Sequence, residues 1–218
     1  MGKFVKNHCT GNHRRAPGRP RSERARRAIL SCTLRFLENR RNGFADLTIE
    51  HVAAAAEVGK ATVYRWWPNK AALVADAFAG SVTRKLHFPD TGSVMQDLKL
   101  QMHQLVKILR SRRGNLVSAI LGAGQSDHTL ITAFRERFLM PRRAEAYVTL
   151  QRGIDRGELP ASLDMNLLLD ALYGPIYMRF LIRHDPLTPE FVDELCIIVF
   201  GRFQTAAPKA KAAPPAGQ

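Results

Sequence analysis

The chain has 218 residues, of which 45% are hydrophobic, a share typical of globular proteins and large enough for a small domain followed by a larger one. It shows no apolar run long enough to span a bilayer, no signal-peptide core and only three scattered cysteines, which argues against a membrane protein or a disulfide framework and favours a cytoplasmic location. The net charge of +14 is unevenly distributed along the chain. Residues 1–86 hold 17 Lys and Arg against 6 Asp and Glu, whereas residues 87–218 hold 16 Lys and Arg against 13 Asp and Glu. A polyanionic partner, either nucleic acid or an anionic membrane, is therefore expected for the first part only.

The N-terminal segment, residues 1–20, is polar, basic and interrupted by glycine and proline, a composition that predicts a disordered arm. A helix is expected to begin at Ser22, which is a suitable N-cap. Its buried face is predicted from apolar side chains spaced three and four residues apart, at Ala25, Ile29, Cys32 and Phe36. Cations followed by a glycine at 40–43 are expected to end it.

Three shorter helices are expected next. Thr48 can cap the first of them, and a break at 57–59 separates it from the second. The second is predicted to carry Thr62 to Trp67 and to end at Pro68. Asn69 can cap the third, and no stretch in this part of the chain alternates like a strand.

The remainder of the chain is also predicted to be helical. Apolar stripes place helices at about 95–109, 116–121, 127–157, 164–180 and 188–203, with a kink or restart at Pro141. The tail at 206–218 has no core-forming residues and is predicted to be disordered. The sequence therefore predicts an all-α protein with a first domain at 21–86 and a second at 87–205.

The second and third expected helices fit a helix-turn-helix unit, in which the second helix enters the major groove of DNA. Ala53 is small where the two helices must approach, and Val58 and Val63 can fill the space between them. Trp67 is expected to turn inward as an anchor. An ordinary helical hairpin with a solvated basic face has the same spacing, so spacing alone leaves both interpretations open.

The segment LTIEHVAAAAEVGKATVYRWWPNKAALVADAF, which begins at Leu47, resembles the DNA-binding domain of the tetracycline-repressor (TetR) family. The positions that match the family pattern are Thr48, Val52, Ala53, Ala56, Val58, Thr62, Tyr64, Pro68 and Lys70. Glu57 stands where the family usually has glycine in the turn, and Gly59 stands where serine usually caps the recognition helix. The resemblance implies an all-helical homodimer with an N-terminal helix-turn-helix domain and a larger C-terminal domain that dimerises and often binds a small ligand.

Carried over residue by residue, the resemblance implies contacts with double-stranded operator DNA. The expected phosphate contacts are Thr48, Tyr64 and Lys70, and the expected base-reading residues are Lys60, Ala61, Thr62 and Arg65, with Trp66 at the edge of the groove. Thr48 and Lys70 each lie at a helix N-terminus, where free amides favour a phosphate.

The segment Gly18–Arg21 is similar to the core of an AT-hook. An extended backbone would place Arg19 and Arg21 around Pro20, and arginine is electrostatically favoured in a narrow, A·T-rich minor groove. A tail that only improves solubility is the alternative interpretation.

The second domain offers candidates for a pocket and for a dimer interface. Side chains that could line a pocket for a small apolar or amphipathic effector are Met102, Phe134, Phe138, Tyr173 and Tyr177, with plain core packing as the alternative. The last two helices are predicted to form a four-helix interface across a two-fold axis, through Leu168, Leu172, Ile176, Leu195, Ile198 and Val199.

No catalytic, metal or cofactor constellation stands out. His8, Cys9 and His13 lack a second pair of ligands, and His103, His128 and His184 are isolated. The leading hypothesis is therefore a repressor of palindromic operators that a small molecule releases, with no enzyme activity and no cofactor. An architectural DNA-binding protein without an inducer, or a helical enzyme or carrier, are the other classes; the long, nearly neutral second part argues against the architectural one.

Overall fold

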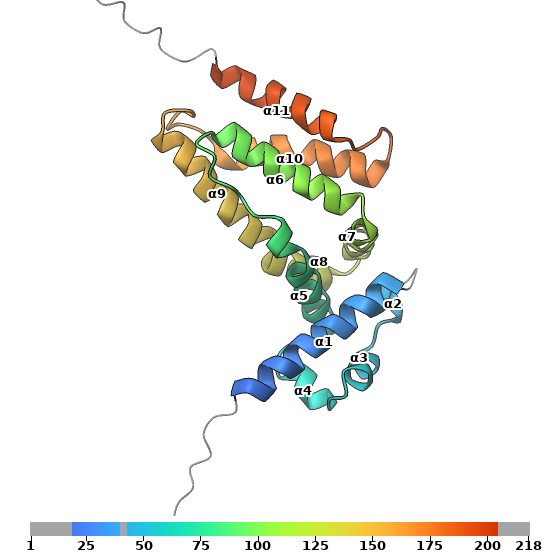
Figure 1. Ribbon diagram of the computed structural model, residues 1–218. Coiled ribbons are helices and arrows are strands. Elements are labelled where there is room, and N and C mark those ends of the chain that lie inside the picture. The colour runs from blue at the N-terminus through green and yellow to red at the C-terminus, as the bar shows by residue number, and fades with distance from the viewer. Residues whose placement is uncertain (1–18, 40–42, 205–218) are drawn as a thin grey trace, which may run out of the picture.

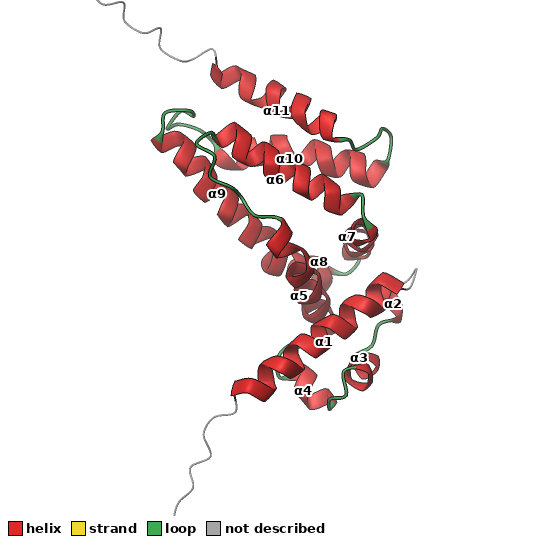
Figure 2. Cartoon of the chain, viewed as in Figure 1, coloured by secondary structure: helices red, strands yellow, loops and turns green. Residues whose placement is uncertain are grey.

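The computed structural model describes residues 19–39 and 43–204, which form helices and connecting loops but no strand (Figure 2). The α-helices are α1 (Arg19–Asn39), α2 (Gly43–Asp46), α3 (Ile49–Ala55), α4 (Lys60–Tyr64), α5 (Lys70–Val82), α6 (Val94–Leu109), α7 (Arg112–Gly124), α8 (His128–Phe134), α9 (Met140–Asp155), α10 (Met165–Ile182) and α11 (Pro189–Gln204), with a 3-10 turn η1 (Thr83–Lys85) and a π-helical turn η2 (Arg135–Leu139). The predicted all-α class is confirmed. Within the described ranges, no helix combines the length and the apolar character needed to cross a membrane.

The first helix begins earlier than predicted. Helix α1 starts at Arg19, so Ser22 lies inside it and does not cap it. The expected extended backbone of Arg19–Arg21 is therefore wrong: these residues form the first turn of α1. Pro20 is tolerated there because the first amides of a helix have no intrahelical acceptor to lose. The disorder expected for the rest of the arm and for the C-terminal tail concerns residues outside the described ranges.

The end of α1 also differs from the expectation. The helix ends at Asn39, and the predicted terminating cations lie outside the described residues. Gly43, expected to end a helix, instead begins the short helix α2, which was not predicted. Four residues are too short for an apolar stripe to be recognised in a sequence.

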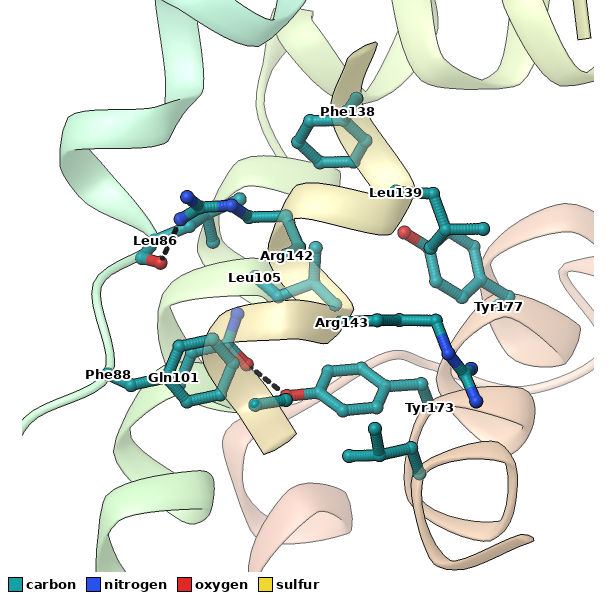
Figure 3. A pocket seen from close by; sticks show the side chains of 12 residues that line it. Leu86, Phe88, Gln101, Leu105, Phe138, Leu139, Arg142, Arg143, Tyr173 and Tyr177 are labelled. Carbon is teal, nitrogen blue, oxygen red and sulfur yellow. Dashed lines mark hydrogen bonds between the residues drawn. The ribbon is translucent and has the colours of Figure 1, made fainter. Parts of the chain in front are cut away.

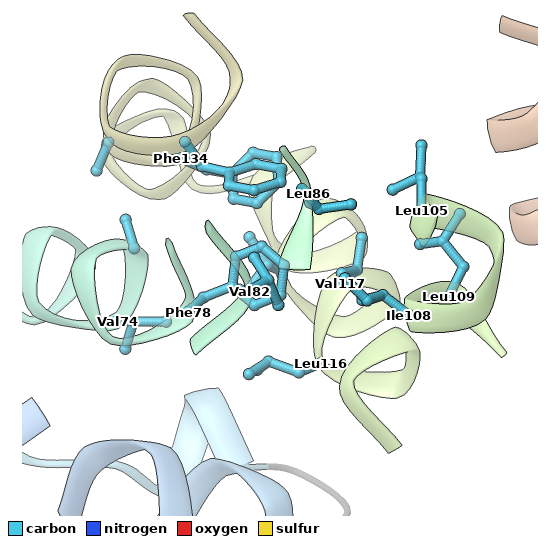
Figure 4. Close-up of a cluster of buried hydrophobic side chains, with 14 of the residues drawn as sticks. Val74, Phe78, Val82, Leu86, Leu105, Ile108, Leu109, Leu116, Val117 and Phe134 are labelled. Carbon is cyan, nitrogen blue, oxygen red and sulfur yellow. The ribbon is translucent and has the colours of Figure 1, made fainter. Parts of the chain in front are cut away.

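Helix α5 connects the N-terminal helices with the C-terminal ones. It packs against α1 on one side and against α8 and η2 on the other. The ring of Phe78 lies 5.8 Å from that of Phe134 and 4.9 Å from that of Phe138, measured between centroids. Figure 4 shows Phe78 and Val82 of α5 in a cluster with Leu116 and Val117 of α7. Because this core is continuous, a displacement of α5 affects both halves of the molecule.

A π-helical turn interrupts the long helical run from α8 to α9. The predicted irregularity at Pro141 is present, but it lies just before the proline, in η2. Pro141 has no amide hydrogen to donate one turn back, and its ring crowds the carbonyl there, so the preceding turn widens. This widened turn carries Phe138 and Leu139, which matter for the cavity described below.

Helices α10 and α11 lie at the opposite end of the molecule from α4 (Figure 1). Four of the six predicted dimer contacts are buried within the protomer: Leu168, Leu172, Ile176 and Leu195 are 5%, 0%, 0% and 8% exposed. Those four assignments are wrong, and Val199 is half-buried, whereas Ile198 is 75% exposed. The exposed large apolar side chains of the two helices are Leu167, Met178, Leu181, Ile182, Ile197 and Ile198, which we call the outer face. Apolar residues lie on every side of helix α10, so its sequence does not distinguish inner from outer.

Candidate functional site

Helices α3 and α4 form the expected helix-turn-helix pair. The Thr48 hydroxyl accepts a hydrogen bond from the amide of His51 at 3.2 Å, so Thr48 caps α3 as predicted. Ala53 and Val63 are 3% and 0% exposed, and Val58 packs against the core cluster that contains them both, which agrees with the prediction. Helix α4 begins two residues earlier than expected and ends at Tyr64, with the chain turning through 65–67 before Pro68.

The turn between α3 and α4 has Glu57 in the left-handed region, with φ of 55°. The amide of Val58 donates to the carbonyl of Ala53 at 3.0 Å, and that of Glu57 donates to Ala54 at 3.2 Å. This pair of bonds is a Schellman motif, in which the left-handed position usually belongs to glycine. The same pair of bonds ends α9, where Gly157 has φ of 76°.

Replacing Glu57 by glycine is expected to stabilise the protein. Relief of left-handed strain is worth roughly 1–2 kcal/mol, and the greater freedom of glycine in the unfolded chain takes back roughly 0.4–1 kcal/mol. The expected net increase in the free energy of unfolding is on the order of 0.5–1 kcal/mol, measured by urea denaturation. The matched variant Gly157→Ala should lower it by a similar amount, since nothing within 4 Å would meet the added methyl group. A destabilised Glu57→Gly protein would contradict the strain argument.

Trp67 holds the end of the helix-turn-helix formed by α3 and α4, which we call the recognition unit, against the rest of the protein. Its side chain is fully buried, and its indole Nε1 donates to Asp76 Oδ2 on α5 at 2.8 Å. The guanidinium of Arg26 on α1 lies 5.9 Å from the Trp67 ring and 3.8 Å from the same carboxylate. The predicted inward anchor is thus tied to both α1 and α5, which fixes how far α4 projects from the molecule.

The outward side of α4 presents short and cationic side chains. Lys60, Ala61 and Arg65 are exposed, Thr62 is half-buried, and Tyr64 is 50% exposed. Lys60 forms an ion pair of 2.7 Å with Glu50 of α3, and the resulting hydrogen bond lowers the pKa of Glu50. Both partners are exposed, so the pair is weak and can yield to a stronger anion.

The remaining predicted contacts lie at the rim of this surface. Thr48 is exposed at the start of α3, and Trp66 is half-buried beside Arg26. Lys70 is partly engaged within the protein: its ammonium donates to the carbonyl of Phe44 at 2.9 Å and lies 4.4 Å from the ring centroid. An ammonium has three donors, so Lys70 keeps donors for another acceptor.

The second domain contains a cavity of about 60 Å³ (Figure 3). Its lining residues are Leu86, Phe88, Gln101, Leu105, Phe138, Leu139, Arg142, Arg143, Ala146, Leu169, Tyr173 and Tyr177. Three of the five predicted pocket residues, Phe138, Tyr173 and Tyr177, line it. Met102 and Phe134 do not: Met102 is fully buried with its sulfur 3.9 Å from that of Cys196, and Phe134 packs on Phe78. Those two are core residues.

Beside the two predicted tyrosines, the sequence interpretation missed the other polar lining residues, Gln101, Arg142 and Arg143. A signal existed for Gln101, because it occupies an apolar spacing with Leu98, Leu105 and Ile108 on α6, and all four are buried. A polar residue within an apolar stripe marks either a buried hydrogen bond or a ligand contact. No comparable signal exists for Leu86 and Phe88, which reach the cavity from the loop between η1 and α6.

Comparison with known proteins shows which family the chain belongs to. Residues 40–77 match the family model of bacterial regulatory proteins of the tetR family, and residues 88–199 match that of the tetracyclin repressor-like C-terminal domain. The second match alone covers about half of the chain. The chain belongs to the TetR family.

Several relatives resemble the chain over most of its length. The uncharacterized HTH-type transcriptional regulator YdeS of Bacillus subtilis is 40% identical, over 87% of this chain and 95% of the relative. Rv1556 of Mycobacterium tuberculosis, also an uncharacterized HTH-type transcriptional regulator, is 33% identical over 77% of this chain and 81% of the relative. The crystal structure of the TetR family transcription regulator SCO0332 superposes with a TM-score of 0.72 at 34% identity, covering 81% of this chain and 97% of that one.

Membership of the TetR family makes the protein a DNA-binding transcriptional regulator and not an enzyme. Members of this family bind DNA operators and dimerise. In the part of the chain that the structure describes, no group of three or more His, Cys, Asp or Glu is arranged to hold a metal ion. The candidate DNA-binding surface of this chain lies at α4, and its second domain contains the cavity.

In this TetR family member, Asp76 connects the recognition unit with η2, which forms part of the cavity wall. Its carboxylate accepts from Trp67 at the end of the recognition unit and pairs with Arg137 of η2 at 3.0 Å. The next residue along η2 is Phe138, which lines the cavity and packs on Phe78 of the same α5. A short chain of contacts thus runs from the cavity wall to the recognition helix.

Proposed function

We propose that the protein is a repressor that binds a palindromic operator as a homodimer and is released by a small molecule. The observation that carries the proposal is the exposed side of α4, with its cations and short side chains, on a unit anchored by the buried Trp67. Such a helix fits the major groove, and two copies related by a two-fold axis would lie about 34–36 Å apart or somewhat more to enter successive grooves. The protein would act on DNA in the cytoplasm.

The outer face of α10 and α11 is the proposed dimer interface. Leu167, Met178 and Ile182 on α10 are 63%, 56% and 62% exposed. Together they expose a large apolar patch to solvent, and such patches often mark protein–protein interfaces. Ala171 and Gly174, also exposed on α10, are small enough to let a partner helix approach closely. Pairing α10 and α11 with their copies would bury this surface in a four-helix arrangement and would leave α4, at the opposite end of the molecule, free for DNA (Figure 1).

The contacts with DNA are proposed to divide into two kinds. Thr48, Tyr64 and Lys70 would hold phosphates, which fixes the register of the protein on the duplex. Lys60, Ala61, Thr62 and Arg65 would face base edges, with Trp66 at the rim of the groove. Arg19 and Arg21 lie at the start of α1 and not in an extended arm. They are proposed to lie near the phosphate backbone of the DNA that flanks the site.

The test of this function is a footprint of the full chain on DNA from its own promoter region. One short, symmetric protected site is the expected result. Broad protection without a boundary would favour an architectural DNA-binding protein, and no protection at any concentration would favour a carrier. Release of the site by compounds from a screen would then support the inducible repressor.

Two substitutions, one in α4 and one directly after it, should have different effects. Arg65→Ala should weaken binding to the operator by roughly 1–3 kcal/mol, the value of one good base contact, with a smaller effect on random DNA. Tyr64→Phe should weaken binding to both by the same factor, because a phosphate contact carries no sequence information. Fluorescence anisotropy with both duplexes at fixed salt measures this, and Arg112→Ala, an exposed arginine on α7, is the control. Equal losses on both duplexes for Arg65→Ala would contradict its reading role.

The cavity is the proposed site of the releasing molecule. One wall is η2, which is connected to Trp67 through Arg137 and Asp76, and another is the loop that follows η1 at the end of α5. A molecule that widens the cavity would move one or both walls and with them α5. It can shift the protein toward a form with low affinity for DNA only by as much as it prefers that form.

A further inference from the structure

The charged groups that line the cavity are all paired, and its unpaired polar groups are uncharged. Arg142 donates to the carbonyl of Leu86 at 2.9 Å and pairs with Glu145. Arg143 pairs with Asp170 at 2.7 Å. Figure 3 shows the two guanidiniums at opposite edges of the cavity, each pointing away from its centre. Each lining cation thus already has a carboxylate, and neither requires an anionic ligand.

Three neutral side chains form the inner polar surface. The Tyr173 hydroxyl donates to Gln101 Oε1 at 2.5 Å, and Gln101 is only 3% exposed. Among the described residues, no hydrogen-bond partner is found for the Gln101 amide nitrogen or for the Tyr177 hydroxyl, and neither belongs to the fully enclosed polar atoms that lack one, so both face accessible space. In Figure 3 the Tyr177 hydroxyl points toward the middle of the lining residues. Burial raises the pKa of Tyr177 to about 12 and raises that of Tyr173 as well, so both phenols stay neutral at physiological pH.

The size of the cavity limits what it can hold without moving. A volume of about 60 Å³ is that of about two water molecules, whereas a single aromatic ring needs roughly 150 Å³. The wall that can yield is the loop containing Leu86 and Phe88, because it has no regular secondary structure and Phe88 is only half-buried. The helical walls pack within the core and can move less than this loop.

We infer that the effector is an uncharged, mainly apolar molecule with about one ring and one oxygen acceptor, which takes hydrogen bonds from Gln101 and Tyr177 and enters by displacing Phe88. This inference rests on the proposed function, since it names the ligand class for the same cavity. A carboxylate could accept from the same two donors, but like an ammonium it would lose its hydration without gaining a free counter-ion, because both lining arginines are already paired, so the cavity disfavours both. A plain hydrocarbon would leave the two donors unpaired.

The test uses four probes that share a methylphenyl group: p-cresol, toluene, 4-methylbenzoate and 4-methylbenzylamine. Calorimetry on the full chain at pH 7 is expected to show binding of p-cresol, with toluene roughly three- to tenfold weaker, as fits one or two neutral hydrogen bonds. The two charged probes should not bind. Phe88→Ala, which opens the wall, should tighten the binding of both neutral probes and leave the ratio of their dissociation constants unchanged.

Two variants locate the hydrogen bonds. Tyr177→Phe and Gln101→Leu should each bring the ratio of the toluene and p-cresol dissociation constants closer to one. Tyr147→Phe should leave this ratio unchanged, because the Tyr147 hydroxyl bonds to Asn166. Binding of 4-methylbenzoate as tight as that of p-cresol, an unchanged ratio in both variants, or no binding even to Phe88→Ala would overturn the inference. Operator affinity without a probe, measured on the same samples, shows separately whether the DNA-binding function holds.

Discussion

An Ile198→Asp protein is expected to be monomeric at micromolar concentration and to lose operator binding. Ile198 is 75% exposed in the protomer, so the aspartate is solvated there and the fold should persist. In the proposed dimer the same carboxylate would be buried without a partner, which costs roughly 3–5 kcal/mol. That cost raises the dissociation constant of the dimer more than roughly a hundredfold.

Sedimentation velocity and operator titration of the same samples check this expectation. The matched control is Val148→Asp, because Val148 is 62% exposed on α9 and lies outside the outer face. The control should remain dimeric and bind the operator normally. If Ile198→Asp also remains dimeric, the interface lies elsewhere, and the proposed spacing of the two recognition helices loses its basis.

A Trp67→Ala protein is expected to lose much of its folding stability. Trp67 is fully buried, and deleting a buried aromatic ring typically costs about 3–5 kcal/mol. The substitution also removes the donor to Asp76, which then faces Arg26 and Arg137 alone. Because α5 belongs to the common core, the loss should appear in the global unfolding transition and not only near α4.

The neighbouring tryptophan provides the control for this measurement. Trp66 is half-buried, so Trp66→Ala removes less surface from contact with the core and should cost roughly 1–2 kcal/mol. Urea denaturation followed by circular dichroism compares the two variants at one pH. Similar losses for both would show that Trp67 is not the anchor of the recognition unit. A local transition in Trp67→Ala alone would show that α4 unfolds independently of α5.

Much of the DNA-binding unit could be predicted because its determinants are local. Thr48 and Asn69 cap helices through bonds to amides three residues away, and the turn at Glu57 closes within five residues. The inward position of Trp67 follows from the same short segment. The shorter helix α4 and the bond from Lys70 to Phe44 could not be predicted, since the second depends on α2, a helix with no sequence signal.

The sequence by itself determined the helical class, the order of the helix-turn-helix unit and the family, because caps, turns and apolar spacing act over a few residues. Only the tertiary structure decided which side of α10 faces inward, since a helix that is apolar all round buries whichever side its neighbours cover. The same holds for the cavity, whose walls come from the loop after η1, from α6, from η2 and α9, and from α10. Gln101 and Tyr173 are 72 residues apart in the chain, and only packing brings the amide and the phenol within hydrogen-bonding distance.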